Sequence, residues 1–542
     1  MGDKVDMKDV QLHDDVDVEA GEKQAMTGVY NGLDVPGDES AQPPSTTAGP
    51  GTVSPTRFTG LTKEQLLKQA NEPFWKRTRY ALLALFWLAW LAMLVGAIMI
   101  IVTAPRCQAP PELTWYEETA VYHVDVRSFL DSDTDGVGDF KGLLSKLEYV
   151  KQLQVHALLL SPVHSTELDD ADRTYFGTVD GDVGSMEDFG DVLAGATNKD
   201  INIILDLTQN YKSSGTKWLR SRDLENDVAV AMEFWMGKGV YGFLITHLED
   251  FNSTKMAKEM LSLWHNKTKD YASGQKQRVL MVSSADGTLA DEMVREGLAD
   301  MAIPRDLTQA LKASGNIGPG LLTDVLQNLV PHGDSGLRGW LIGGPGYGHL
   351  ASVVPDHLSG VLSIFLLTLP GTPFISYGDE IGLQEIENVT WSDVGMAMQW
   401  SNSENAGFTN GKSGIPVNPE YATRNVQRFS GLKSNSSLLM YQKLNKLKWN
   451  DWSVKYGNLT IVKDTSMLLS YKLVWDRSPR FLVCLNFGDM PSRYNMVGFD
   501  MDLPETAVVV TGTHELAGKN ILLTELDLGP YEGLVLKYKF EE

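Results

Sequence analysis

The chain has 542 residues, enough for roughly two to four domains of about 100–200 residues each. Hydrophobic residues make up 43% and charged residues 22%, which is ordinary globular usage and excludes a wholly disordered protein. The net charge of −23 excludes a broad nucleic-acid-binding surface. The two cysteines, Cys107 and Cys484, are too few for a disulfide scaffold or a cysteine-rich zinc module.

Residues 1–79 are predicted to form an acidic and largely disordered N-terminal tail. Residues 1–60 contain 11 acids and 4 bases and lack helical or strand periodicity. Residues 41–55 are rich in Pro, Ser, Thr and Gly. From Leu61 the pattern indicates a short amphipathic helix, with Thr62 as its N-cap and Gln65 completing a capping box.

Residues 80–102 are predicted to form one transmembrane signal-anchor helix. The run Tyr80–Val102 has 23 residues and no charge, and as a helix it would be about 34 Å long. A buried globular helix and a cleaved signal peptide fit less well, because every face is apolar and the run begins far from the N-terminus. Basic residues precede the run, whereas Arg106 is the only basic residue that closely follows it. The positive-inside rule therefore predicts a cytoplasmic N-terminus and a single-pass type II protein with its C-terminus outside the cell.

The segment outside the membrane is predicted to begin with a neck, residues 103–114, that contains Cys107. Cys107 lies in an expected oxidising compartment and has no sequence-local partner, so an interchain disulfide, a homodimer bond and a free thiol are all compatible with its position. Five Asn-x-Ser/Thr sequons all follow the span and are predicted to be glycosylated: Asn252, Asn266, Asn388, Asn435 and Asn458.

Residues 115–451 are predicted to form a (β/α)8 barrel, because short apolar runs alternate with helical patterns. The expected strands are Ala120–Val126, Ala157–Ser161, Asn202–Leu207, Gly242–His247, Arg278–Ser283, Leu298–Ile303, Gly339–Ile342 and Pro373–Tyr377. Expected helices include Leu143–Leu153, Met186–Ala196, Lys255–Asn266, Leu321–Val330 and Ser436–Lys448.

Residues 452–542 are predicted to form a separate antiparallel β-sandwich domain. Four strand patterns follow one another there without intervening helices: Ser466–Trp475, Arg480–Asn486, Ala507–Thr511 and Gly533–Tyr538. Cys484 lies inside one of these apolar strands, which favours a buried and inert thiol. The fold class is thus α/β, with one transmembrane helix, a barrel and a C-terminal β domain.

Several stretches of residues 115–542 resemble the α-amylase superfamily of glycoside hydrolases. The long ones are Tyr122–Gly142, Lys146–Pro162 and Leu369–Gly382, and the short ones are Met398-Gln-Trp and Ala406-Gly-Phe. The resemblance implies the barrel and the C-terminal β domain.

The resemblance also implies that the catalytic positions are degenerate. The family's strand-four motif Gly-x-Arg-x-Asp is matched by residues 242–246, with Leu244 at the arginine and Thr246 at the nucleophilic aspartate. Asp206 matches the aspartate of the family's strand-three motif, but Tyr211 stands at the position of the histidine in that motif. Strand five ends Val282-Ser283-Ser284, without the acid/base glutamate. Because glycoside cleavage needs two positioned carboxylates, we expect no enzyme activity. Glu249 and Asp250 lie on the loop beyond Thr246 and are not expected to substitute.

One loop matches the family's calcium motif: Asp131, Asp133, Asp135, the carbonyl of Val137 and Asp139. Alternating oxygen ligands with a turn glycine suit Ca²⁺. A structural Ca²⁺ site and a solvated acidic loop are equally open, and no other cofactor is expected.

An amylase-like domain on one N-terminal span resembles the heavy chains of heteromeric amino-acid transporters, of the type represented by the 4F2 cell-surface antigen. The residues that carry this resemblance are Gly60–Lys68, Arg77–Leu94 and Ala104–Cys107. The other heavy-chain type carries an extra domain after the third strand, for which the 31 residues between Asn210 and Gly242 leave no room.

The heavy-chain resemblance implies that Cys107 forms a disulfide with a polytopic light chain, which does the transport. The heavy chain then escorts the light chain to the plasma membrane and stabilises it there. The membrane is the other expected partner, and integrins are a further one. Two alternatives stay open: an adhesion or signalling receptor that acts without a light chain, and, more remotely, a membrane-anchored glycosidase.

Overall fold

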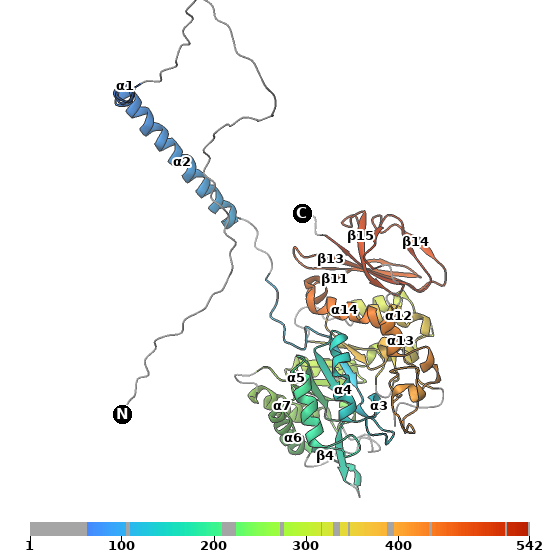
Figure 1. Ribbon diagram of the computed structural model, residues 1–542. Helices are drawn as coiled ribbons and strands as arrows, with labels where there is room; N and C mark the ends of the chain where they lie inside the picture. Colours follow the sequence, from blue (N-terminus) through green and yellow to red (C-terminus); the bar gives the residue numbers. More distant parts are fainter. Residues whose placement is uncertain are drawn as a thin grey trace, which may run out of the picture. The chain divides into compact units, whose positions relative to one another are not determined.

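The computed structural model describes residues 62–103, 109–167, 170–208, 224–271, 276–315, 317–328, 337–344, 347–386, 395–432, 436–514 and 517–539, with the side chains of 166–173 left out. The chain divides into two compact units, Met1–Ala104 and Pro105–Glu542. Figure 1 shows the second unit as a barrel wrapped by helices, with an antiparallel sheet packed at one end.

The first unit contains a short helix, α1 (Lys63–Ala70), and a long one, α2 (Pro73–Thr103). The expected capping box is present at the start of α1, where the Gln65 side chain accepts a hydrogen bond from the Thr62 backbone N–H at 3.2 Å. Helix α2 has 31 residues, none of them buried, and its apolar stretch is long enough to cross a membrane. It begins before the predicted span because Pro73 is well tolerated in the first helical turn.

Eight parallel strands form the barrel in the second unit. They are β1 (Val121–Val124), β2 (Ala157–Leu160), β5 (Asn202–Asp206), β6 (Gly242–Ile245), β7 (Val279–Ser284), β8 (Met301–Pro304), β9 (Gly339–Leu341) and β10 (Thr372–Ser376). Their order is β8-β7-β6-β5-β2-β1-β10-β9. A parallel bridge between Ala302 and Arg338 links the two ends of this order. All eight predicted strands and the barrel are therefore confirmed.

Alternate strand residues face opposite sides of the barrel wall, as the two-residue period of a strand requires. Val121, Leu159, Ile204, Met281 and Phe374 belong to one apolar cluster inside the barrel. Their neighbours along the strands join a larger core with the surrounding helices. Both faces are buried, which explains why these strands read as continuous apolar runs.

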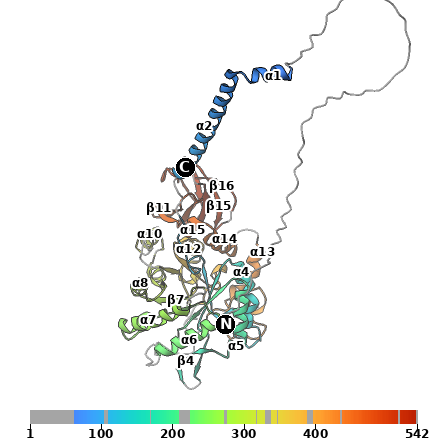
Figure 2. The same ribbon diagram turned by 90° about the vertical axis from the view of Figure 1, so that its left-hand side faces the viewer.

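Helices surround the barrel (Figure 2). They are α3 (Val126–Phe129), α4 (Phe140–Gln152), α5 (Met186–Thr197), α6 (Leu224–Lys238), α7 (Thr254–Tyr271), α8 (Gly287–Arg295), α9 (Asp306–Ala313), α10 (Pro319–Asn328), α11 (Leu350–Val353), α12 (Asp356–Thr368), α13 (Val426–Gly431), α14 (Ser437–Asn450) and α15 (Trp452–Lys455). Short 3₁₀ turns are η2 (Leu248–Asp250), η3 (Asp379–Ile381), η4 (Glu404–Gly407) and η5 (Pro419–Ala422), and β3 (His164–Glu167) with β4 (Asp170–Val179) forms a hairpin. The five expected helices are present with shifted ends.

The C-terminal residues form a six-stranded antiparallel sheet in the order β11-β12-β13-β18-β15-β16. Its strands are β11 (Asn458–Asp464), β12 (Leu468–Val474), β13 (Arg480–Asn486), β15 (Thr506–Gly512), β16 (Asn520–Leu522) and β18 (Gly533–Tyr538). A two-stranded sheet, β14 (Ser492–Tyr494) with β17 (Leu526–Leu528), covers one face through a separate apolar cluster. The opposite face shares the core of the barrel helices.

Candidate functional site at the carboxyl ends of the barrel strands

The predicted degenerate catalytic positions lie where β5 and β6 end. Asp206 is the last residue of β5, Leu244 lies within β6, and Thr246 follows that strand directly. All three are at least nine-tenths buried. The parallel strands bring Asp206 and Thr246 to the same end of the barrel, as expected for the site of a (β/α)8 fold. Tyr211 lies outside the described residues.

A chain of hydrogen bonds occupies this position. Thr208 donates to Asp206 Oδ1 from its backbone N–H at 2.8 Å and also from its hydroxyl. The hydroxyls of Thr208 and Thr246 lie 2.7 Å apart. The Thr246 hydroxyl is thus held by a hydrogen bond to the Thr208 hydroxyl. A hydroxyl is not a general base, so this partner does not activate Thr246 as a nucleophile.

Leu244 belongs to the apolar cluster inside the barrel, together with Val279 and Met281. An arginine occupies this position in the superfamily that the sequence resembles. The leucine side chain can neither orient nor neutralise a carboxylate at the neighbouring strand end, because it carries no hydrogen-bond donor. The interactions of Leu244 with this cluster are apolar packing contacts.

Burial raises the pKa of Asp206 to about 6, although the hydrogen bonds from Thr208 and the positive charge of Arg305 oppose this shift. Arg305 directly follows β8, is largely buried, and places its guanidinium 5.3 Å from the ring centre of Tyr347. His123 at β1 is also buried, and its pKa falls to about 4 because of that burial and the charge of Arg305. This end of the barrel therefore holds neutral or charge-compensated groups near neutral pH.

The end of β7 carries two serines, Ser283 and Ser284. Ser283 donates to the carbonyl of Ile303 at 2.7 Å, and Ser284 donates to Glu249 Oε2 at 2.7 Å. The backbone N–H of Ala285 donates to the same Glu249 oxygen at 3.1 Å. Glu249, from the turn after β6, is therefore fixed against the end of β7.

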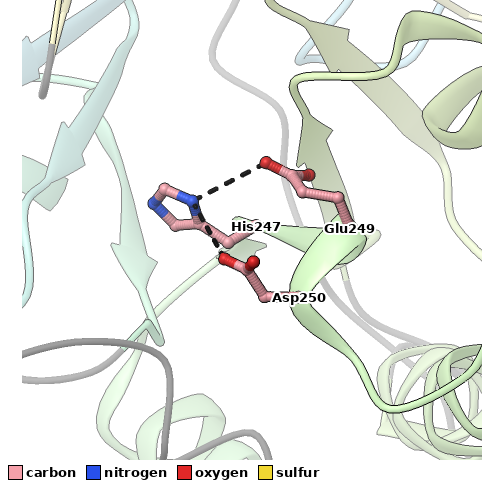
Figure 3. Close-up of side chains that lie close together, drawn as sticks. All are labelled: His247, Glu249 and Asp250. Carbon is pink, nitrogen blue, oxygen red and sulfur yellow. Dashed lines mark ion pairs between the residues drawn. The ribbon is translucent and has the colours of Figure 1, made fainter.

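Sequence analysis did not single out His247. This residue has φ 59° and ψ 45°, the left-handed conformation, and begins the short turn η2. Its Nδ1 lies 3.8 Å from Glu249 Oε1 and 3.7 Å from Asp250 Oδ2 (Figure 3). The cluster depends on a backbone conformation that only Gly, Asn, Asp and His adopt readily, and the order of residues alone does not reveal it.

The acidic loop between α3 and α4 brings Asp131, Asp133 and Asp139 together, with oxygens within 4.8 Å of one another. Asp131 accepts from the backbone N–H groups of Thr134 at 2.7 Å and Gly136 at 2.8 Å. These convergent oxygens fit a hard cation such as Ca²⁺.

Asp135, another predicted ligand of this loop, is not one of these three carboxylates, and the carbonyl of Val137 stays a predicted ligand. Asp135 accepts from the N–H of Val137 at 2.8 Å. Its pKa is raised by desolvation and by Asp133, Asp131 and Asp139, although the hydrogen bond from Val137 lowers it. The loop thus concentrates negative charge around Asp135 as well.

The predicted modification sites are only partly within the described residues. Asn252, Asn266 and Asn458 are exposed, as an attached glycan requires. Asn388, Asn435 and Cys107 lie outside the described residues. Cys484 is fully buried, and burial raises the pKa of its thiol, so it is inert as expected.

Comparisons with known proteins agree with this architecture. The family described as "Alpha amylase, catalytic domain" matches residues 123–226 and 352–457, and "Solute carrier family 3 member 2 N-terminus" matches residues 50–122. The crystal structure of the trehalulose synthase MutB from Pseudomonas mesoacidophila has a TM-score of 0.67 and 19% identity, over 79% of this chain and all of that one. The fold therefore defines an amylase-like (β/α)8 protein with one apolar N-terminal helix.

Two curated relatives narrow this class. "Amino acid transporter heavy chain SLC3A2" of Rattus norvegicus is 32% identical over 99% of both chains. "Amino acid transporter heavy chain SLC3A1" of Mus musculus is 25% identical over 89% of this chain and 86% of its own length. The chain belongs to the family of amino acid transporter heavy chains, and the resemblance to the 4F2 type is confirmed.

Proposed function

We propose that this protein is the non-catalytic heavy-chain subunit of a heteromeric amino-acid transporter, linked through Cys107 to a polytopic light chain. Similarity to a named heavy chain along 99% of both chains carries the proposal. One apolar helix of 31 residues is the only candidate span in the part of the chain that the structure describes. A single helix encloses no substrate path, so the transport path belongs to the partner.

The heavy chain sets the location and stability of the complex. Its disulfide tethers the light chain at high effective concentration, while contacts outside the disulfide contribute the remaining affinity. Binding to the folded light chain stabilises that chain by mass action, so that it leaves the endoplasmic reticulum and stays at the plasma membrane. Substrate choice lies with the light chain.

The proposal includes a type II topology. Lys76, Arg77 and Arg79 at the start of α2 favour a cytoplasmic N-terminus. The exposed sequons Asn252, Asn266 and Asn458 are then outside the cell and open to glycosylation. We also infer that this barrel end does not cleave glycosides, because Thr246 and the serines Ser283 and Ser284 stand at the strand ends where the family motif has carboxylates.

Electrophoresis with and without reductant tests the proposal directly. Full-length protein from surface membranes is compared with Cys107→Ser and with Cys484→Ser, which is the matched control because its thiol is buried. We expect a heavy band that falls by the mass of a multispan protein on reduction, absent in Cys107→Ser and kept in Cys484→Ser. Mass spectrometry of the released band then identifies the light chain.

A monomer in every lane, with no co-purifying multispan protein, would contradict the disulfide and the heavy-chain mechanism. Capture of integrins or cytoskeletal adaptors alone would favour the receptor function instead. Release of sugar from a chromogenic maltoside by the purified wild-type protein would contradict the non-catalytic assignment.

A further inference from the structure

Three side chains meet at the turn after β6, beside the position of Thr246. The left-handed conformation of His247 brings its ring back over the turn η2 (Leu248–Asp250). Figure 3 shows the same ring nitrogen, Nδ1, facing both Glu249 and Asp250. One nitrogen and two carboxylate oxygens thus lie within 4.8 Å of one another.

Glu249 is held in place from outside this turn. Its Oε2 accepts hydrogen bonds from Ser284 Oγ at 2.7 Å and from the N–H of Ala285 at 3.1 Å. These bonds leave Oε1 directed at His247. Carboxylates that ligate metals are commonly oriented by such partners, because the fixed oxygen loses less entropy when the ion binds.

The carboxylates of this turn form ion pairs with the histidine of the same turn. Within the described residues, the ion pairs of Glu249 and Asp250 are with His247 alone.

We propose that His247, Glu249 and Asp250 form a binding site for a divalent transition-metal ion, with Zn²⁺ as the best-suited ion. Mixed nitrogen and carboxylate ligation suits Zn²⁺, whereas Ca²⁺ and Mg²⁺ prefer oxygen ligands alone. Ligands at about 2.0–2.2 Å from a tetrahedral Zn²⁺ are about 3.4 Å apart. The observed separations of 3.7 and 3.8 Å approach this value, so small side-chain rotations complete the site.

The ion would be bound by one turn of the barrel. His247, Glu249 and Asp250 all belong to the turn after β6, and Ser284 at the end of β7 donates to Glu249 and so links this turn to the neighbouring strand. Three protein ligands leave a fourth position for water, since these side chains are only partly buried. The site is independent of the heavy-chain function, because it lies in the barrel and involves neither α2 nor Cys107.

The test measures Zn²⁺ binding to the full-length protein in detergent micelles, with any histidine tag removed. Equilibrium dialysis against Zn²⁺ alone, with metal content by atomic absorption, is expected to give one ion per chain. His247→Gln and Asp250→Asn are expected to weaken binding at least tenfold. Ser284→Ala, which removes one of the two hydrogen-bond donors to Glu249 and also the acceptor of the Asp286 N–H, is expected to weaken binding by about tenfold.

His514→Gln is the matched control. His514 is more exposed than His247, and its Nδ1 lies 4.0 Å from one carboxylate, that of Glu532. We expect this variant to bind Zn²⁺ like the wild type. Co²⁺ in place of Zn²⁺ should give a visible absorption band in the wild type and in His514→Gln, and lose it in His247→Gln.

Substoichiometric Zn²⁺ in the wild type would overturn the proposal, whatever the variants do. Unchanged affinity in both His247→Gln and Asp250→Asn would overturn it as well, because the bound ion would then lie elsewhere. Circular dichroism and the thermal midpoint of each variant without metal identify any that is misfolded. If either ligand variant is misfolded, loss of affinity in folded Ser284→Ala supports the site, and unchanged affinity there contradicts it.

Discussion

Lys448 in α14 is a buried basic residue. Its side chain is almost fully buried, and its ammonium donates to the carbonyl of Leu369 at 2.8 Å. Burial, assisted by repulsion from Lys455, lowers the pKa of Lys448 to about 7. Near physiological pH the folded protein therefore holds this amine close to its titration midpoint, whereas the unfolded chain keeps it protonated.

The pKa of Lys448 predicts a dependence of stability on pH. The lowered folded-state pKa disfavours the folded state most below about pH 7, and the penalty declines as pH rises toward the unfolded value of about 10.4. Lys448→Met removes the charge but loses one hydrogen bond, worth about 1 kcal/mol. We expect the variant to be more stable than the wild type at pH 6, with a smaller difference at pH 9.

Urea unfolding at pH 6, 7.5 and 9 measures this difference. Lys443→Met, in the same helix, is the control for a general effect of an added methionine. A gap between wild type and Lys448→Met that stays constant over this range would show that Lys448 does not titrate there.

A carboxylate at position 246 is expected to destabilise the barrel. Thr246→Asp places a carboxylate within hydrogen-bond range of Thr208, which already serves the buried Asp206. We expect this variant to lose about 1–3 kcal/mol of stability, because a second buried acid adds desolvation and like-charge repulsion. We also expect no hydrolysis of a chromogenic maltoside, since no glutamate stands at the end of β7.

Thr246→Val is the comparison for that experiment. It removes one hydroxyl and adds no charge, so a loss of about 1 kcal/mol is expected from the missing hydrogen bond. Thermal unfolding gives both values. Sugar release by Thr246→Asp would mean that a second carboxylate in the barrel acts as the general acid.

Among the elements, α4 is joined to the acidic loop by one carboxylate. Asp139 caps the helix through the N–H of Gly142 at 2.8 Å, and it also accepts from the N–H of Ser132 at 2.7 Å. This cap explains why α4 begins three residues before the predicted start. The same side chain is one of the three convergent acids, so any bound Ca²⁺ would share it with the helix.

Added Ca²⁺ distinguishes the two interpretations of this loop. If the loop binds Ca²⁺, an ion concentration ten times the Kd stabilises the protein by about 1.4 kcal/mol. We expect millimolar Ca²⁺ to raise the Tm of the wild type, and EGTA to reverse the change, with neither effect in Asp131→Asn. Mg²⁺ is the control ion. Equal responses of wild type and variant would favour a solvated acidic loop.

The sequence predicts the elements unevenly, and the reason is burial. Strands buried on both faces leave an apolar run, so all eight barrel strands were identified from the sequence. The edge strand β11 has only partly buried and exposed residues, and it was missed. The hairpin β3–β4 is rich in polar residues and was missed as well. At the candidate site, motif spacing located Asp206 and Thr246, while the cluster at His247 depends on one backbone angle.

In the whole Pro105–Glu542 unit, the barrel and the C-terminal sheet are joined through one core. Leu485 and Phe481 of β13 belong to the same cluster as Ile364 and Phe365 of α12. A hydrogen bond of 2.5 Å between Thr368 Oγ1 and Tyr471 Oη crosses the same boundary. A Cβ atom on Gly533 of β18 would lie 2.8 Å from Ile364 Cδ1, so the Ile364 side chain would have to shift to accommodate it. Such close packing transmits changes in the sheet to the barrel helices.

Two leucines on opposite faces of β13 test this coupling. Leu485 faces the barrel core and Leu482 faces the cluster under β14 and β17, and both are fully buried. Truncation of either to alanine is expected to cost about 2–5 kcal/mol. Because the cavities open on different sides, Leu485→Ala should increase hydrogen exchange in α12, whereas Leu482→Ala should increase it in β14 and β17. Equal loss of protection in α12 from both variants would mean that the sheet and the barrel open as one unit, whichever face is disturbed.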